Sequence, residues 1–207
     1  MKVNYFPIYG RAEPIRMLLN HAKAPFEDNK IPMDQWPKIK GDTSRFEFGQ
    51  MPMVEMENGL KMTQTCAIIR ALGQKYGYYS SNPKEAWLID STMDYVNETG
   101  GLFGAVIFAQ GEKKTELLFE LLTKQLPDFL KIIEKRVSGK KFLTGEKLSC
   151  ADFMLGSLLC NTVANENNPN YYAFAHITKS YPAVVSYIEN FKAELKDHLA
   201  ARGPAPF

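Results

Sequence analysis

The stretch Gly49-Gln50-Met51-Pro52 leads directly into the short apolar run Met53-Val54-Glu55-Met56. A proline at the start of a strand has no N–H group to donate to a sheet. An X-Pro bond adopts the cis form at a cost of only roughly 0.5–1 kcal/mol. A cis bond between Met51 and Pro52 turns the N–H and C=O groups of Met51 away from the sheet, where they can pair with an extended peptide. The stretch therefore predicts a strand that begins beside a peptide-binding slot.

A turn signal and a helix start follow this strand. Asn58-Gly59 is typical of a two-residue hairpin turn. Thr63 or Thr65 can begin a helix, expected over residues 64–76, whose first N–H groups form an anion site. A peptide slot beside a carboxylate-binding helix start predicts a small acidic peptide as the ligand.

The first part of the chain has the pattern of a small mixed sheet covered by helices. Residues 2–6 and 25–31 read as strands, and residues 12–21 between them have apolar side chains at helical spacing. An irregular segment, residues 32–50, precedes the hairpin. This order predicts an α/β thioredoxin-like domain over residues 1–77. Because the chain has no Cys-x-x-Cys motif, dithiol exchange is not supported.

The rest of the chain is predicted to be helical. Residues 78–83 contain turn signals and are expected to form a linker, followed by an all-α domain over residues 84–207. Ser149 and Asp152 are typical of a helix N-cap, to which we assign no chemistry. Residues 203–206 are expected to form an ordinary non-helical tail. The expected helices span residues 85–110, 115–137, 150–165 and 181–199.

Composition narrows the classes of function. The net charge is +2 and no basic run occurs, so we expect no nucleic-acid partner. No apolar stretch reaches membrane-spanning length and no signal peptide is recognisable, so we expect no membrane association. The three cysteines, Cys66, Cys150 and Cys160, lack metal-ligand spacing and are interpreted as free thiols in a reducing compartment. A cytoplasmic protein without a metal site is the expectation.

Single residues give only weak signals for chemistry. Tyr5 ends the first strand beside a Pro- and Gly-containing loop, where it is also an ordinary strand aromatic. Arg11 opens a helix although the helix dipole prefers anions there. A functional role is one explanation for an arginine at this position. An ion pair, either with Glu13 or between the domains, explains it equally well. Each of the remaining candidates also has a structural explanation as a solvated charge, a lid over the core or a helix cap: Trp36, Lys40, Gln50, Gln64, Thr65 and Glu98.

Taken together, these signals resemble one family. The combination, in this order and spacing, is similar to the cytosolic glutathione transferases, most of all the sigma class, and the similarity covers nearly the whole chain. The resemblance implies the glutathione transferase fold, with glutathione as co-substrate and no metal requirement. The motifs that carry it are Tyr5-Phe6-Pro7, Gly10-Arg11-Ala12-Glu13-Pro14-Ile15-Arg16, Gln35-Trp36-Pro37-Lys38-Ile39-Lys40, Phe48-Gly49-Gln50-Met51-Pro52 and Gln64-Thr65-Cys66-Ala67-Ile68.

The resemblance also implies roles for particular residues. Tyr5 would donate a hydrogen bond to the glutathione sulfur, with help from Arg11, and the thiolate would attack a small hydrophobic electrophile. The active unit would be a homodimer. Glutathione would be bound by Tyr5, Trp36, Lys40, Gln50, Met51, Pro52, Gln64, Thr65 and, across the dimer, Glu98 of the partner subunit. The electrophile pocket would be formed by Phe6, Ile8, Gly10, Phe103 and Phe108.

Some positions depart from the family pattern, and two other functions stay open. Tyr9 stands where an arginine or a small residue is common, Thr65 replaces a serine, and Asn97-Glu98 replaces two aspartates. Gly100, Gly101 and Gly104 loosen a helix and admit either substrate or a close helix contact. The first alternative function is a glutathione-dependent prostaglandin isomerase or lipid peroxidase. The second is a non-catalytic, crystallin-like structural protein.

Overall fold

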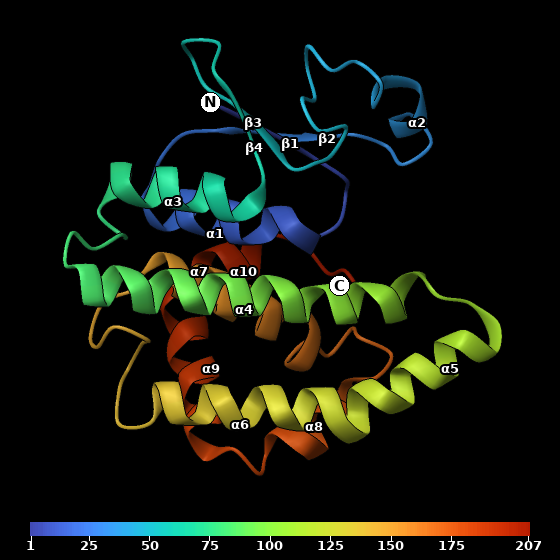
Figure 1. The fold of residues 1–207 in the computed structure, drawn as a ribbon, viewed down its shortest axis with the longest axis vertical. Helices are drawn as coiled ribbons and strands as arrows, with labels where there is room; N and C mark the ends of the chain where they lie inside the picture. The colour runs from blue at the N-terminus through green and yellow to red at the C-terminus, as the bar shows by residue number, and fades with distance from the viewer.

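The computed structural model describes residues 1–207, which form a sheet with its covering helices and a helical bundle below it (Figure 1). The four strands lie in the order β2-β1-β3-β4. β1 pairs in parallel with β2, whereas the β1–β3 and β3–β4 pairs are antiparallel. This mixed sheet confirms the predicted thioredoxin-like arrangement. The strands are β1 (Lys2–Tyr5), β2 (Glu27–Lys30), β3 (Met53–Glu55) and β4 (Lys61–Thr63).

Two helices, α1 (Glu13–His21) and α3 (Thr65–Tyr76), lie between the sheet and the bundle (Figure 1). A short 3-10 turn, η1 (Gly10–Ala12), leads into α1. Pro14 occupies the first turn of α1, where the backbone N–H has no helical partner and proline is tolerated. α3 ends at Gly77, whose φ of +83° gives the left-handed cap that glycine adopts without a steric penalty.

The region before α3 differs locally from the expectation. The N–H of Met56 donates to the carbonyl of Leu60, so the hairpin loop is residues 57–59 and not a two-residue turn. Gly59 has φ +83° at the end of this loop, the position that a three-residue loop reserves for glycine. The segment expected to be irregular contains a short helix, α2 (Trp36–Ile39), with Pro37 in its first turn.

The second part of the chain is all-helical, as predicted. Helices 111–137 and 150–163 each contain a π-helical stretch, η2 and η3, where the hydrogen bonds reach one residue further than in an α-helix. The elements are α4 (Pro83–Phe108), α5 (Gly111–Glu120), η2 (Leu121–Gln125), α6 (Leu126–Val137), α7 (Cys150–Leu158), η3 (Leu159–Val163), α8 (Tyr171–Thr178), α9 (Pro182–Glu194) and α10 (Lys196–Ala201).

One helix was not expected from the sequence. Of the expected helices, one begins earlier than predicted and another is divided into two. α8 lies in a stretch rich in aromatic residues that follows an Asn-rich turn, so its helical pattern is weak. The helix expected to begin at residue 115 begins at Gly111. The last expected helix is divided at Leu195 into α9 and α10.

The two parts of the molecule share one hydrophobic core of 39 buried residues. Gly73 of α3 packs so closely on Cys150 of α7 that an added Cβ atom would lie 2.0 Å from the cysteine sulfur. The Asp152 carboxylate accepts hydrogen bonds from the Ser149 N–H (2.8 Å) and hydroxyl (2.6 Å), which is the expected helix cap. It also accepts from the Leu143 N–H at 3.0 Å and the Tyr187 hydroxyl at 3.1 Å, so this cap joins α7 to α9.

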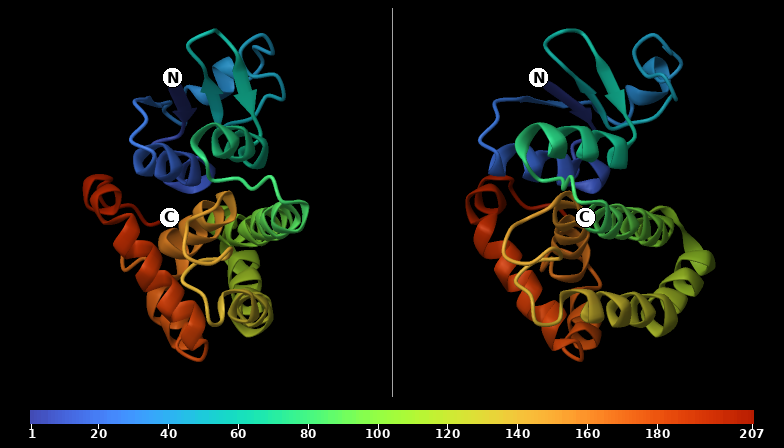
Figure 2. Two further views of the ribbon diagram at one scale, coloured as in Figure 1. Left: turned by 90° about the vertical axis from the view of Figure 1, so that its left-hand side faces the viewer. Right: turned by 60° about the vertical axis from the view of Figure 1, so that its left-hand side comes forward.

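The C-terminal tail lies where the two parts meet, as two further views show (Figure 2). The Tyr9 N–H donates to the carbonyl of Phe207 at 3.3 Å, and the Tyr9 hydroxyl donates to the carbonyl of Gly203. The Asn165 side chain donates to the carbonyl of Ala205 at 2.9 Å. The tail is therefore anchored along its length, which the sequence did not indicate. Among the helices, none has both the length and the apolar character needed to cross a membrane.

Candidate active site

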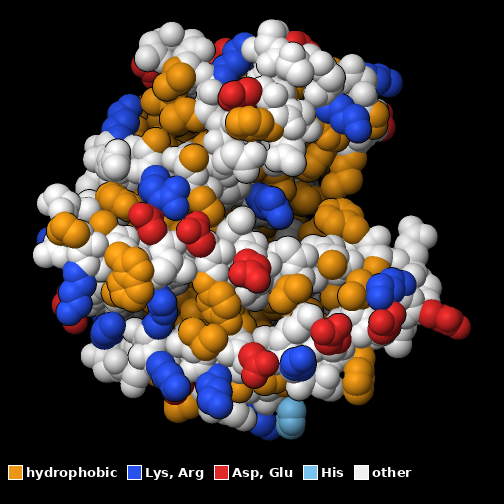
Figure 3. Space-filling model, in the orientation of Figure 1, with side chains coloured by type: hydrophobic (Ala, Val, Ile, Leu, Met, Phe, Trp, Pro, Cys, Tyr) orange, Lys and Arg blue, Asp and Glu red, His pale blue; other side chains and the backbone are white.

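A cavity of about 610 Å³ lies between the sheet and the helical bundle. On the right-hand side of Figure 3 the surface is hollowed between the sheet and α4, and hydrophobic side chains gather in the hollow. The lining comes from the loop after β1, the turn before β3, the start of α3, the helices α4 and α7 with η3, and the tail. The predicted site residues that line it are Tyr5, Ile8, Gly10, Arg11, Trp36, Gln50, Met51, Thr65, Phe103 and Phe108.

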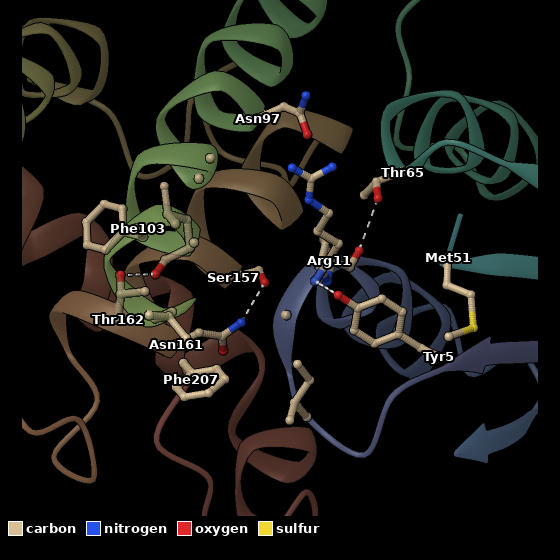
Figure 4. A pocket seen from close by; sticks show the side chains of 18 of the residues that line it. Tyr5, Arg11, Met51, Thr65, Asn97, Phe103, Ser157, Asn161, Thr162 and Phe207 are labelled. Carbon is tan, nitrogen blue, oxygen red and sulfur yellow. Dashed lines mark hydrogen bonds between the residues drawn. The ribbon is translucent and has the colours of Figure 1, made fainter. Parts of the chain in front are cut away.

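The phenol of Tyr5 lies at the floor of the cavity with its hydroxyl group held in place (Figure 4). The backbone N–H of Arg11 donates to the Tyr5 oxygen at 3.1 Å, and the phenol hydrogen has no acceptor within the chain. Burial raises the pKa of Tyr5, and the Arg11 N–H together with the charges of Arg11 and Arg16 offsets this only in part. The phenol is thus protonated at neutral pH and can donate its hydrogen into the cavity.

Gly10 makes room for the Tyr5 hydroxyl. A Cβ atom at this position would lie 2.7 Å from the Tyr5 oxygen, and the φ of Gly10 is +45°. Both observations require glycine, because no other residue avoids the contact or adopts this backbone readily. The loop that contains Gly10 is also fixed by Arg16, whose guanidinium donates to the carbonyls of Ile8 (2.9 Å) and Tyr9 (3.2 Å). The sequence analysis did not identify this role of Arg16.

The guanidinium of Arg11 forms no hydrogen bond or ion pair within the chain, although it lies at the cavity. Glu13, the partner considered from the sequence, pairs with Arg16, His198 and Arg202 instead. An ion pair with Glu13, one of the explanations left open for Arg11, is therefore not formed. In Figure 4 the Arg11 side chain extends between Asn97 and Thr65, so its charge faces the space between the two parts of the molecule.

The backbone at Met51 is arranged as the sequence suggested. The Met51-Pro52 peptide bond is cis. Met51 lines the cavity, and its N–H and C=O groups form no hydrogen bond within the chain, because the pairing of β3 begins only at Met53. A free donor and a free acceptor on one residue can pair with an extended peptide.

The start of α3 supplies further donors. Thr65 is buried, and its hydroxyl donates to the carbonyl of Arg11 at 3.3 Å. Gln64 has a φ of +69°, an unusual conformation for a residue with a side chain, and such residues cluster at functional sites. The Gln64 side chain donates to the Gln50 side chain at 3.0 Å. The first N–H groups of α3 have no partner within the chain, which makes this helix start a site for an anion.

Five predicted site residues lie outside the cavity lining. Phe6 packs between Tyr5 and Trp36, with its ring centroid 5.3 Å and 6.0 Å from theirs. Pro52 is buried under the turn before β3, and Gln64 is exposed beside Gln50. The remaining two, Lys40 at the end of α2 and Glu98 on α4, are exposed on the surface.

The structure adds lining residues that the sequence analysis missed. Tyr9, a departure from the family pattern, does not line the cavity but anchors the C-terminal tail. The last residue of that tail, Phe207, lines the cavity. Gly101 and Gly104 face open space, so these glycines widen the cavity. Ser157, Asn161 and Thr162 form part of the opposite wall. A signal for this wall was present, because these are polar residues within an otherwise apolar helical stretch. No group of three or more His, Cys, Asp or Glu side chains could hold a metal ion.

Comparison with known proteins identifies the family. Residues 1–73 match the family model described as glutathione S-transferase, N-terminal domain, and residues 100–202 match the model described as glutathione S-transferase, C-terminal domain. Glutathione S-transferase P 1 of Xenopus laevis is 30% identical over 197 residues, which cover 94% of this chain and 88% of that protein. The chain belongs to the glutathione S-transferase family, whose members use glutathione as co-substrate.

Solved structures of the same fold include two prostaglandin synthases. Prostaglandin synthase D of Nilaparvata lugens has a TM-score of 0.83 and 28% identity, with 99% of this chain and 98% of the other covered. Rat hPGDS in complex with a quinoline has a TM-score of 0.86 and 25% identity, with 100% and 98% covered. The similarity in both structures extends over the sheet and the helical bundle together.

Proposed function

We propose that this chain activates the thiol of glutathione as a thiolate and transfers it to hydrophobic electrophiles. The observation that carries the proposal is the Tyr5 hydroxyl, which is protonated, held by the Arg11 N–H at 3.1 Å and free to donate into the cavity. A hydrogen bond to a sulfur anion favours the charged form and lowers the thiol pKa. The Arg11 guanidinium, which has no partner of its own in the chain, adds a positive charge beside the sulfur.

The proposed position of glutathione follows from the free donors along the cavity. Met51, next to the cis bond to Pro52, would pair its backbone with the cysteinyl unit. The start of α3, with Gln64 and Thr65, would bind the γ-glutamyl carboxylate. The glycine end would lie near Trp36 and Gln50, which line the cavity. Lys40 is exposed at the end of α2, the helix that contains Trp36, and its flexible side chain would reach the glycine carboxylate.

The electrophile would occupy the apolar part of the cavity. Ile8 and Gly10 come from the loop after β1, and Phe103 and Phe108 come from α4. Phe6 lies behind this wall and supports Tyr5 and Trp36. Binding both molecules in one cavity places the thiolate next to the reacting carbon, and this proximity supplies much of the acceleration.

A titration of the bound thiol tests the proposal. A free thiol titrates near ~8.5, and a charge-assisted hydrogen bond of roughly 2.7 kcal/mol lowers the pKa by about two units. We expect the ultraviolet absorbance of the thiolate in the protein complex to appear with a midpoint about two pH units below that of free glutathione. Binding of glutathione with an unshifted midpoint would rule out thiolate activation and would favour the crystallin-like structural role.

A second candidate function uses the same site. The structural similarity to two prostaglandin synthases favours a glutathione-dependent isomerase or peroxidase of sigma type. In an isomerase the thiolate would attack the substrate and leave again, so glutathione would not be consumed. Assays with a prostaglandin endoperoxide, in which product and remaining glutathione are both measured, separate this function from conjugation. We further propose a detoxifying role in the cytoplasm, in agreement with the three free cysteines.

The proposed active unit is a homodimer in which Glu98 of the partner subunit binds the amino group of glutathione. Glu98 is exposed on α4 and has no hydrogen-bond partner in its own chain, so it is available to a second subunit. We expect Glu98→Ala to weaken glutathione binding about fivefold, the effect of one partly exposed charged contact. Calorimetric titration of the dimeric variant measures this change.

Glu189→Ala is the matched control for Glu98→Ala, because Glu189 is an exposed acid on α9 that does not line the cavity. Its glutathione affinity should equal that of the wild type. Equal affinities in the Glu98 variant and in the control would contradict the proposed contact across the dimer.

A further inference from the structure

The wall of the cavity opposite Tyr5 contains polar side chains that thiol activation does not use. α7 and η3 are otherwise apolar along this stretch, with Met154 and Leu158 among the lining residues. Ser157 and Asn161 also line the cavity, and their side chains point toward one another (Figure 4). Both are buried, with exposed fractions of 2% and 5%. A buried polar group without a hydrogen-bond partner is energetically costly. The hydrogen bonds that these two side chains form within the chain therefore show which of their donors are left for a ligand.

The amide of Asn161 has a fixed orientation. The Arg202 guanidinium donates to its Oδ1 atom at 2.7 Å, and arginine offers only donors. The Nδ2 atom therefore lies on the side of Ser157 and donates to the Ser157 oxygen at 3.1 Å. An amide NH₂ group has two hydrogens, and the second one has no acceptor within the chain.

The Ser157 hydroxyl is a second available donor. Its oxygen accepts from Asn161, and its own hydrogen has no acceptor within the chain. Thr162 on the same wall is different, because its hydroxyl donates to the carbonyl of Leu158 at 2.6 Å. The wall thus presents two unused donors, one from Ser157 and one from Asn161, and the Thr162 hydroxyl is already engaged.

These donors are held by a rigid network. Arg202 also donates to the Glu13 carboxylate at 3.0 Å, and its guanidinium lies 3.9 Å from the centre of the Tyr9 ring. Asn161 lies within the π-helical segment η3, and such segments occur frequently at functional sites. Donors that are fixed before the substrate arrives stabilise a developing negative charge without reorganisation.

We propose that Ser157 and Asn161 bind an oxygen of the electrophile and thereby select α,β-unsaturated carbonyl compounds. This inference rests on the proposed function, because Tyr5 must stabilise the glutathione thiolate that attacks the electrophile. The sulfur of the thiolate forms a bond to the β-carbon, and the electron pair of the C=C bond moves onto the carbonyl oxygen. The resulting enolate oxygen accepts hydrogen bonds from Ser157 and Asn161. A proton from water then adds to the α-carbon, which restores the carbonyl, and no group leaves.

Two kinds of electrophile should respond differently to the loss of these donors. In an addition to an unsaturated ketone, the negative charge develops on an oxygen, where the two donors act. In a displacement at benzyl chloride, the charge develops on chloride and the substrate has no oxygen. Loss of the donors should therefore affect the ketone reaction far more than the displacement.

The experiment compares kcat/KM for trans-4-phenyl-3-buten-2-one and benzyl chloride, both with glutathione. We expect the ratio of the two values, ketone over chloride, to fall about tenfold in Ser157→Ala, the effect of one hydrogen bond to a developing charge. Asn161→Leu, which preserves the approximate volume, should lower the ratio by a similar factor. Thr162→Val is the matched control, and it should leave the ratio unchanged because the Thr162 hydroxyl is already engaged.

Each outcome decides the question. A ratio that is unchanged in both Ser157→Ala and Asn161→Leu overturns the inference, while the proposed transferase function survives because both substrates are still conjugated. A ratio that falls equally in Thr162→Val also overturns it, since the effect then comes from general disturbance of the wall. A wild-type protein that conjugates neither compound overturns the proposed function and, with it, this inference. A fall confined to the Ser157 and Asn161 variants supports it.

Discussion

Replacing Tyr5 with phenylalanine should lower kcat/KM for glutathione conjugation on the order of a hundredfold. The reason is the loss of one charge-assisted hydrogen bond to the sulfur, worth roughly 2.7 kcal/mol if it shifts the thiol pKa by two units. The Tyr5 ring packs against Phe6 at 5.3 Å between centroids, and phenylalanine preserves this contact. The change therefore removes the donor while the fold and most glutathione contacts remain.

The measurement is a comparison of conjugation rates, glutathione affinities and thiol pKa values in the wild type and Tyr5→Phe. Affinity for glutathione should change less than about threefold, because Met51 and the start of α3 still bind the peptide backbone and the carboxylate. The pKa of the bound thiol should return toward its free value. Tyr172→Phe is the control, since Tyr172 is 86% exposed and its hydroxyl forms no hydrogen bond. A Tyr5→Phe variant as active as this control would exclude Tyr5 as the activating donor.

The parts of the site that the sequence predicted are those determined by neighbouring residues. The cis proline after Met51 and the helix that begins at Thr65 depend on local backbone chemistry, which is visible in a few consecutive residues. Gly10 and Arg11 lie in the turn η1, separated from the end of β1 only by the loop 6–9, so their contacts with Tyr5 also depend on residues close in the sequence. For the same reason, the thioredoxin-like sheet and the all-helical part could be predicted from periodicity and turn signals.

The parts that could not be predicted depend on residues far apart in the sequence. Phe207 reaches the cavity because Tyr9 binds the tail from the other end of the chain. No local pattern in residues 203–206 indicates this contact. Asn161 faces the cavity with its NH₂ group only because Arg202 occupies its oxygen. Such orientations are decided by tertiary packing, which periodicity does not report.

Replacing Glu13 with glutamine should destabilise the protein by about 3–5 kcal/mol, the usual cost of leaving buried charges without their partner. The Glu13 side chain is 1% exposed and contacts three basic side chains. His198 lies at 2.8 Å, Arg202 at 3.0 Å and Arg16 at 3.3 Å from its oxygens. Glutamine has nearly the same shape but no charge, so Arg202 would lose its only carboxylate partner and Arg16 would keep only its 2.9 Å ion pair with Asp28. Urea unfolding at neutral pH measures the loss.

The matched control is Glu27→Gln, which breaks the 2.9 Å ion pair with Lys2 at the surface. Because that pair is largely exposed, its loss should cost less than about 1 kcal/mol. If Glu13→Gln costs no more than Glu27→Gln, the buried cluster does not stabilise the fold.

The same cluster predicts how the stability of the wild type changes with pH. Burial alone favours the neutral acid, yet the hydrogen bond from His198 and the charges of His198, Arg202 and Arg16 outweigh it and lower the pKa of Glu13 from 4.5 to about 2. Because the folded state binds this proton less readily than the unfolded state, the stabilisation is complete above pH 4.5 and is lost as the pH falls toward 2. The free-energy difference between wild type and Glu13→Gln should therefore shrink over this range. A difference that stays constant from pH 5 to pH 2 would show that the charge of Glu13 is not what holds α1 to the C-terminal segment.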